Sequence, residues 1–159
     1  MTLILRRYAP ADLQAVWALH QLTSQVAGVP TPEPYFSDLH DVEFAFLNRG
    51  GEFVVGEYQG HIVAMGGLKR TAGDRAEIVR MRVHPDFQRQ GFGSAVLRHL
   101  EKCAAELGYR TLHLDTLVVQ EAAQQFYFRH GYRCVGRGYK EAFEVVFFEK
   151  PLAFNQAEV

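Results

Sequence analysis

The glycine-bearing segment that follows residue 83 has the residue types of a phosphate site built from backbone. Gly91 and Gly93 lack a Cβ, so the main chain can turn tightly there and let a ligand approach its N–H groups. An amphipathic helix is predicted directly afterwards, over residues 95–107. The first N–H groups of a helix have no internal partners and lie at the positive end of its dipole. The segment therefore predicts a site for a phosphate group.

The spacing of these glycines excludes two common phosphate loops. A nucleotide P-loop needs four residues between its glycines and Lys after the second, whereas here one residue separates them and Ser94 follows. The dinucleotide fingerprint would need Gly where Val96 stands. A plain turn without a ligand is the alternative, but a helix start needs a capping side chain, not two glycines preceded by Gln88 and Arg89.

The elements around this loop are predicted from hydrophobic periodicity and from Gly and Pro positions. Three prolines make residues 28–34 irregular, and Gln59-Gly60 suits a two-residue hairpin turn. The predicted strands cover residues 3–8, 53–58, 61–68, 76–83, 111–118, 132–137 and 144–149. One predicted helix begins at residues 10–12, and three more cover residues 37–48, 95–107 and 120–130. This order predicts one α+β domain over residues 1–159, with a central mixed sheet flanked by helices and a parallel crossover from 76–83 to 111–118.

Composition and charge restrict the possible partners. The chain has 159 residues, 48% hydrophobic and 22% charged, which is typical of a globular domain. The formal net charge of −1 gives no basic excess for nucleic acid, and the pairs Arg6-Arg7 and Arg80-x-Arg82 are too short to form basic patches. We therefore expect no nucleic-acid partner.

Membrane and metal sites are not expected either. No apolar run reaches the roughly 18 residues that span a membrane, and the first apolar residues have no basic region ahead of them. His113-x-Asp115 is the nearest approach to a metal-ligand pair, and two residues on one strand face do not make a metal site. A cytoplasmic, metal-free protein is the expectation.

Two motifs and the element order resemble the GNAT N-acetyltransferase superfamily. Gln88-x-x-Gly91-x-Gly93 matches the family's Gln/Arg-x-x-Gly-x-Gly/Ala loop at every specified position. Residues 123–132, Ala-Gln-Gln-Phe-Tyr-Phe-Arg-His-Gly-Tyr, are similar to its Ala-x-x-Phe-Tyr-x-Lys-x-Gly-Phe segment. The resemblance covers nearly the whole chain and is weakest in the N-terminal helices. It implies the acyl-CoA N-acyltransferase fold and acetyl-CoA as the acyl donor.

The resemblance also implies how acetyl-CoA would be held. Backbone groups of Met81 and Val83 would pair with the pantetheine arm as an added strand does. Gln120 stands where the family often has Asn, against the pantetheine, and Arg129 takes the family's Lys position, near the 3′-phosphate or facing water. The loop residues expected at the pyrophosphate are Gln88, Arg89, Gln90, Gly91, Phe92, Gly93 and Ser94.

Two residues are predicted to transfer protons. Tyr127 would lie beside the thioester sulfur and donate to the departing thiolate, because a phenol stays protonated up to about pH 10. The alternative is a tyrosine that only packs in the core.

Glu77 matches a catalytic Glu found in some members of the family, and alternation predicts that it faces the same side as Val79, Met81 and Val83. The alternative is a carboxylate paired with Arg75 or Lys69. The rival bases are His84, His113, Asp115 and water.

The acceptor site is expected in the irregular segment 29–36, the two N-terminal helices and the connection 136–143. These segments hold several acidic residues that would suit an amine: Glu33, Asp38, Asp41, Glu43 and Glu141. The predicted function is N-acetyltransfer from acetyl-CoA to an unidentified primary amine, of a small molecule or a protein, by direct transfer in a ternary complex. The alternative is a non-catalytic acyl-CoA-binding sensor or scaffold. A homodimer is the candidate assembly.

Overall fold

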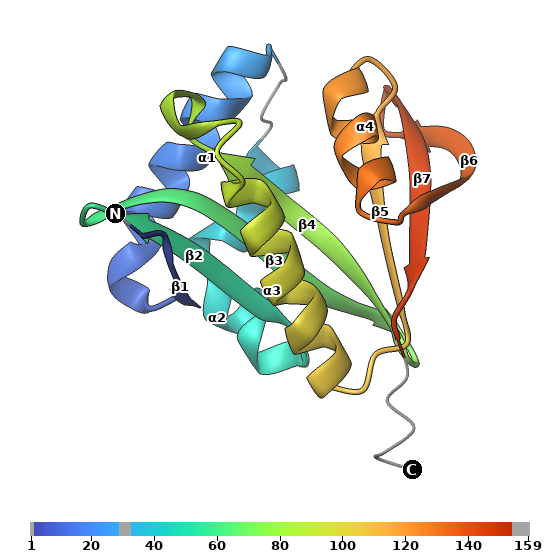
Figure 1. Ribbon diagram of the computed structural model, residues 1–159, viewed down its shortest axis with the longest axis horizontal. Coiled ribbons are helices and arrows are strands. Elements are labelled where there is room, and N and C mark those ends of the chain that lie inside the picture. Colours follow the sequence, from blue (N-terminus) through green and yellow to red (C-terminus); the bar gives the residue numbers. More distant parts are fainter. Residues whose placement is uncertain (1, 29–32, 154–159) are drawn as a thin grey trace.

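The computed structural model describes residues 2–28 and 33–153, which form a seven-stranded sheet with helices on both faces (Figure 1). In chain order the strands are β1 Ile4–Arg7, β2 Glu52–Tyr58, β3 His61–Ala72, β4 Arg75–Val83, β5 Thr111–Leu117, β6 Arg133–Lys140 and β7 Phe143–Pro151. The α-helices are α1 Leu13–Ala27, α2 Val42–Ala45, α3 Phe92–Glu106 and α4 Glu121–Arg129. Short 3-10 helices cover Pro10–Asp12, Glu33–His40, Leu47–Arg49 and Pro85–Phe87.

The sheet is mixed, as the sequence predicts. Its strand order is β1-β2-β3-β4-β5-β7-β6. Neighbouring strands are antiparallel except β4 and β5, which are parallel and joined through α3. The pairing of Tyr58 with His61 confirms the two-residue hairpin turn between β2 and β3.

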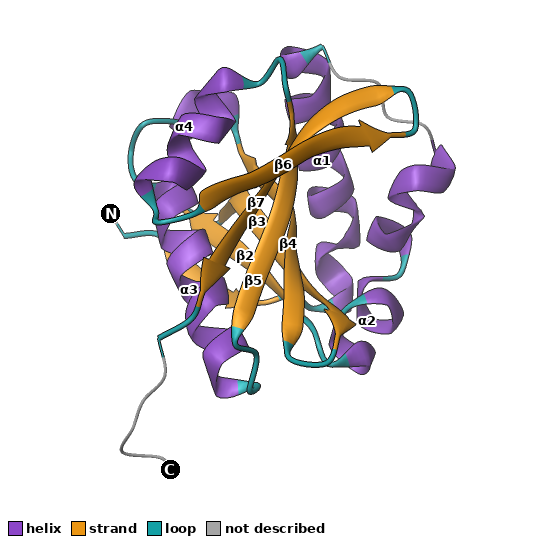
Figure 2. Ribbon diagram, turned by 90° about the vertical axis from the view of Figure 1, so that its right-hand side faces the viewer, coloured by secondary structure: helices purple, strands orange, loops and turns teal. Residues whose placement is uncertain are grey.

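Each face of the sheet has its own hydrophobic core (Figure 2). α3 and α4 cover one face, which we call the α3 face, and α1 and α2 cover the other, which we call the α1 face. The α3-face core includes Ile78, Leu97 and Leu100. The α1-face core includes Val16 and Met65. Both faces of the central strands are therefore buried, and a ligand can reach β4 only where a neighbouring strand leaves it.

Helix α3 begins three residues earlier than the predicted residue 95. Gly91 has φ of +82° and takes the N-cap position, so Phe92 already has helical geometry. The predicted apolar stripe is confirmed, because Val96, Leu97 and Leu100 are fully buried. The loop at residues 88–91 therefore lies between the carboxyl end of β4 and the first turn of α3.

The second N-terminal helix, predicted over residues 37–48, is wrong as one helix. The chain there forms the 3-10 helix Glu33–His40, the single turn α2 and the 3-10 helix Leu47–Arg49. Asp41 breaks the helix because its φ is −147° and its carboxylate accepts the N–H of Phe44, starting a new turn. The apolar residues expected to point inward do so: Leu39, Val42 and Phe46 are buried.

Candidate active site

The N-terminus of α3 presents backbone donors without a capping side chain. No side chain of the described residues accepts a hydrogen bond at this N-terminus. Ala95 N–H is the first to bond back, to Gly91 O at 3.0 Å, so the amides of residues 92–94 have no partner inside the helix. Arg89 and Gly91 both have positive φ, which curls the loop over this end. These amides, at the positive end of the helix dipole, fit a diphosphate better than a neutral group.

The side chains of the loop support its shape. Gln88 Nε2 donates to Val83 O at 3.3 Å, and Arg89 and Gln90 are exposed. Ser94 Oγ lies 2.8 Å from Nε2 of His130, which comes from the end of α4. The Ser94–His130 contact was not predicted from the sequence. It ties the first turn of α3 to α4.

β4 and β5 diverge beyond their short parallel pairing (Figure 1). A cavity lies between them. Their parallel pairing covers three residue pairs, from Arg75 with Thr111 to Glu77 with His113. Beyond Glu77 the cavity has a volume of about 860 Å³. Its walls include residues 78–83 of β4, 115–117 of β5, and Ala123 and Tyr127 of α4. The backbone of Met81 and Val83 borders this opening, where an extended ligand could lie as the missing strand.

A β-bulge at Arg80 decides which side chains face which side of the cavity. Gly67 pairs with Val79 but Met65 pairs with Arg82, so two residues of β4 stand opposite one of β3, and Arg80 has φ of +58°. Such a bulge inverts the alternation beyond it.

The prediction that Glu77 faces the same side as Met81 and Val83 is therefore wrong. Glu77 and Val79 face α1, whereas Met81 and Val83 pack in the α3-face core. A Cβ placed on Gly66 would lie only 2.5 Å from Met81 Sδ, on the α3 face. A strict period of two cannot reveal a bulge that an ordinary arginine forms.

Tyr127 both packs in the core and lines the cavity. Its ring contacts Phe126 and Tyr132, with centroids 5.1 and 5.6 Å away, and the residue is 8% exposed. Within the described chain no group forms a hydrogen bond with its hydroxyl. Burial raises the pKa of Tyr127. The charge of Arg82 opposes this shift, and the charge of Asp115 adds to it. The phenol is thus protonated at neutral pH and free to donate into the cavity.

Glu77 lies at the closed end of the cavity, where the two strands separate. Lys140 Nζ of β6 lies 3.5 Å from Glu77 Oε2 and 2.5 Å from Asp115 Oδ2, so one lysine holds two carboxylates. Neither Arg75 nor Lys69 pairs with Glu77: the first binds Glu149 and the second binds Asp38.

The histidines proposed as rival bases are engaged elsewhere. His113 Nε2 lies 2.8 Å from Thr71 Oγ1, and burial lowers the pKa of His113. His84 Nδ1 accepts the N–H of Asp86, which caps the 3-10 helix Pro85–Phe87.

The two remaining predicted contacts differ in position. Gln120 is the N-cap residue of α4 and lines the cavity, as a pantetheine contact requires. Next to it Gln124 Nε2 donates to Leu117 O and Val118 O, which fixes α4 on the end of β5. Arg129 is exposed at the other end of α4.

The acidic residues expected to bind the amine are mostly used within the fold. Burial alone would raise the pKa of Asp38, but the carboxylate accepts from Lys69 and Arg80, and these two cations hold its pKa below the ordinary value. Asp41 starts α2, and Glu43 is exposed. Of the expected acids, Glu141 alone is among the described residues that line the cavity; the side chain of Glu33 lies outside the described part.

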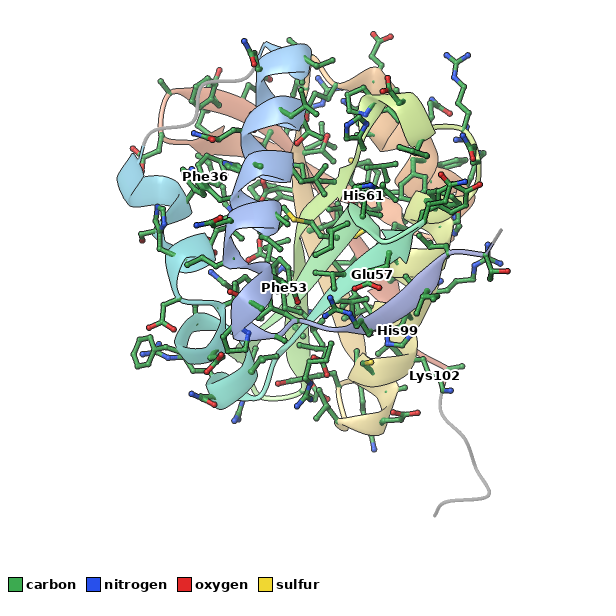
Figure 3. All side chains as sticks on the ribbon, turned by 90° about the vertical axis from the view of Figure 1, so that its left-hand side faces the viewer. Phe36, Phe53, Glu57, His61, His99 and Lys102 are labelled. Carbon is green, nitrogen blue, oxygen red and sulfur yellow. The ribbon has the colours of Figure 1, made fainter. Side chains whose placement is uncertain are left out.

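The segments expected to form the acceptor site line this cavity through Ala27 of α1, Phe36 and Glu141, but sequence reasoning missed the contribution of two arginines. Phe36, labelled in Figure 3, lies under the Arg80 guanidinium at 4.5 Å and beside the buried His20 ring at 4.4 Å. Arg80 and Arg82 both line the cavity. The sequence shows their Arg-x-Arg spacing, which is too short for a basic patch, but nothing in it marks Arg80 as a bulge.

Comparisons with known proteins agree with this geometry. The described residues contain no helix that is long and apolar enough to cross a membrane. A Probable N-acetyltransferase family 8 member 5 from Mus musculus is 27% identical over 106 residues, covering 64% of this chain and 47% of that protein. N-acetyltransferase 8 from Homo sapiens is 27% identical over 109 residues, covering 65% and 48%. The chain thus spans about half the length of these curated relatives.

Solved structures share the fold. An acetyltransferase of the GNAT family from Staphylococcus aureus Mu50 superposes with a TM-score of 0.89 at 20% identity, covering 96% of this chain and all of that one. PaiA N-acetyltransferase from Thermoplasma acidophilum, in complex with coenzyme A, gives 0.74 at 17% identity and covers 92% and 98%. YncA from Salmonella typhimurium, with its cofactor acetyl-CoA, gives 0.76 at 16% identity and covers 98% and 96%. A profile of the Acetyltransferase (GNAT) family matches residues 14–132, and the chain belongs to that family.

Proposed function

We propose that this protein is an acetyl-CoA-dependent N-acetyltransferase that passes the acetyl group directly to a primary amine in a ternary complex. The observation that carries the proposal is one cavity lined by the unpaired stretch of β4, by Tyr127, and by Gln88 of the loop that leads to the uncapped N-terminus of α3. A thioester held between them would meet a proton donor on one side and an open acceptor space on the other.

The proposed binding mode follows from the backbone groups of the α3 N-terminus and of the β4 stretch that β5 leaves unpaired. The amides of residues 92–94 and the loop 88–91 would hold the pyrophosphate, and the Met81 and Val83 backbone would pair with the pantetheine. Gln120 would contact the pantetheine from α4, and Arg129 would lie toward the 3′-phosphate. The coenzyme A and acetyl-CoA complexes of the two structural relatives support this assignment.

The proposed proton transfers use Tyr127 and Glu77. When bound, acetyl-CoA supplies an acetyl group activated as a thioester. Tyr127 would donate its proton to the thiolate as the C–S bond breaks. Glu77 would take the amine proton through water, because its carboxylate lines the same cavity from the α1 face.

Calorimetry with acetyl-CoA tests the proposal, followed by release of free CoA over a panel of amines. We expect micromolar binding and turnover well above hydrolysis for at least one amine. No binding at millimolar acetyl-CoA would overturn the proposal. Binding without turnover on any amine would favour the sensor or scaffold alternative.

A further inference from the structure

Arg82 is a cation that lines the cavity and has no acidic partner among the described residues. Its Nη1 donates to Met81 O at 2.9 Å, so one of the five N–H donors of a guanidinium is used within the described chain. Its neighbours on the cavity wall differ, because Arg80 binds Asp38 at 3.0 Å and Lys140 binds Asp115. Arg82 therefore has donors available to a ligand.

The environment makes this arrangement costly for the fold. Burial, and then the neighbouring Arg80 guanidinium, lower the pKa of Arg82 to about 10, so the group still carries its charge at neutral pH. A desolvated charge without a counterion destabilises a folded protein, and such groups are normally paired. An anion entering the cavity would remove that cost.

The bulge directs Arg82 away from the expected cofactor phosphates. Arg82 stands opposite Met65 on β3, and Met65 belongs to the α1-face core. After burial, the positive charges of Arg82 and then Arg80 lower the pKa of His20 in α1, which places both arginines near that helix. The uncapped end of α3 lies on the opposite face, where Val83 packs 3.5 Å from a Cβ placed on Gly93. An anion that binds Arg82 would therefore lie on the α1 face of the cavity, which we call the acceptor side because the acyl donor is expected on the α3 face.

The charges around the acceptor side are separated. At one end Asp38 is shared by the two cations Lys69 and Arg80, and Arg82 adds a third positive charge. At the other end Lys140 is shared by the two carboxylates Glu77 and Asp115. The α1-face lining also includes apolar groups: Ala27, Phe36, Val79 and Phe143.

We propose that the acceptor amine also carries a carboxylate, as an apolar amino acid does, and that Arg82 binds this carboxylate while the amine points toward Glu77 and the thioester. The inference rests on the proposed acetyl transfer. Arg82 would then be the residue that selects amino acids over simple amines, because a guanidinium binds a carboxylate through two parallel hydrogen bonds.

The test compares acceptors that differ only in the carboxylate. Phenylalanine and leucine are measured against phenylalaninamide and leucinamide by release of free CoA. Wild-type protein should prefer the acids in kcat/KM by about 10- to 100-fold, as expected for hydrogen bonds to a charged group. Arg82→Gln should remove this preference by raising KM for the acids, and Arg82→Lys should restore part of it. Arg133→Gln, on the exposed part of β6, is the matched control and should change nothing.

Two outcomes would overturn the role of Arg82. One is equal use of acids and amides by wild-type protein. The other is an equal loss on both acceptor types in Arg82→Gln, which would indicate general stabilisation of negative charge. If Arg82→Gln does not fold, the acid-to-amide ratios of wild type and Arg82→Lys decide.

A binding measurement separates this inference from the proposed function. Calorimetry with N-acetylphenylalanine and its amide, with no acetyl-CoA present, reports the carboxylate site alone. Tighter binding of the acid, lost in Arg82→Gln, would support the site even if acetyl-CoA did not bind. Equal binding of both would overturn it even if acetyl transfer were demonstrated.

Discussion

At the scale of single residues, the proposed proton donor and the proposed proton acceptor line one cavity from opposite faces of the sheet. Tyr127 comes from the α3 face, and Glu77 comes from the α1 face. The residue types and their motifs could be found in the sequence. Their partners could not, because Lys140 joins Glu77 across a separation of 63 residues.

Replacing Tyr127 with Phe should lower kcat by about 10²- to 10⁴-fold, because the leaving thiolate loses its proton donor. The ring stays in the core, so melting temperature and acetyl-CoA affinity should change little. Steady-state release of CoA and calorimetry measure the two quantities. Tyr132→Phe is the control. The Tyr132 hydroxyl donates to Glu101 at a distance of 2.8 Å and does not line the cavity, so this variant should lose stability and keep its kcat. Unaltered turnover in Tyr127→Phe would remove this residue from the mechanism.

The pH dependence of kcat follows from the same residue. A general acid must be protonated, and burial raises the pKa of Tyr127 above the ordinary value near 10. The phenol therefore loses its proton only at higher pH. We expect that kcat does not fall through deprotonation of Tyr127 up to about pH 9. A descending limb below pH 9 that disappears in Tyr127→Phe would contradict this assignment of the burial effect.

Glu77→Gln should lower kcat/KM at pH 7 by about 10²-fold or more, because the ammonium acceptor then lacks a base. The loss should shrink as the pH approaches the pKa of the amine, since the acceptor arrives already neutral. Rates between pH 7 and pH 10 measure this recovery. Asp115→Asn is the matched variant, because Asp115 shares Lys140. A larger loss in Asp115→Asn than in Glu77→Gln would assign the base to Asp115.

At the scale of elements, β4 determines the site through two interruptions of its pairing. Its ladder with β5 stops at Glu77, and its ladder with β3 shifts at Arg80. The first interruption exposes backbone, and the second turns Arg82 to the α1 face, which Val79 also faces. Neither follows from hydrophobic periodicity, because side chains on both faces of a central strand are buried in any case.

Helix α1 carries a buried histidine that should make stability depend on pH. His20 is fully buried between Trp17 and Phe36, and neither ring nitrogen has a hydrogen-bond partner in the described chain. Burial, then Arg82 and Arg80, lower the pKa of His20 to about 4. The unfolded chain, with a pKa near 6.5, therefore takes up the proton first as pH falls. Stability from this group is full above pH 6.5 and is lost between pH 6.5 and 4.

His20→Leu should remove this part of the pH dependence. Wild type should lose about 2–3 kcal/mol more free energy of unfolding than His20→Leu between pH 7 and 4.5. Urea unfolding at the two pH values measures the difference. The lowered pKa values of His113 and His130 act equally in both proteins and cancel. Equal losses in the two proteins would show that His20 is not kept neutral by burial.

At the scale of the whole molecule, the sequence predicts the order of elements and the parallel crossover because these follow from periodicity and chirality. The N-terminal half was less predictable. Asp38 and Asp41 look like helix-starting residues, but Asp38 binds cations on β3 and β4, which are distant in sequence. The same ion pairs use Asp38, one of the acidic residues that the sequence offers for an amine. Ion pairs between residues that are distant in sequence thus determine the role of Asp38, and a single sequence does not reveal such pairs.

The cavity divides the sheet into two parts, between which the strand pairing is limited to three residue pairs of β4 and β5. β1–β4 and α3 lie on one side, and β5–β7 and α4 on the other (Figure 1). A ligand that pairs with β4 and contacts α4 would connect the two parts. It binds the folded chain alone, so melting temperature should rise with the logarithm of acetyl-CoA concentration.

The residues that acetyl-CoA stabilises distinguish a ligand that bridges the cavity from one that binds only the loop at residues 88–94. Amide hydrogen exchange should slow on acetyl-CoA binding in residues 78–83 and 88–94 and also in residues 117–127 across the cavity. The hairpin of β2 and β3, which borders no part of the cavity, serves as the internal control and should not change. Protection limited to residues 88–94 would mean that the diphosphate alone is held. The unpaired stretch of β4 would then have no role in binding the acyl donor.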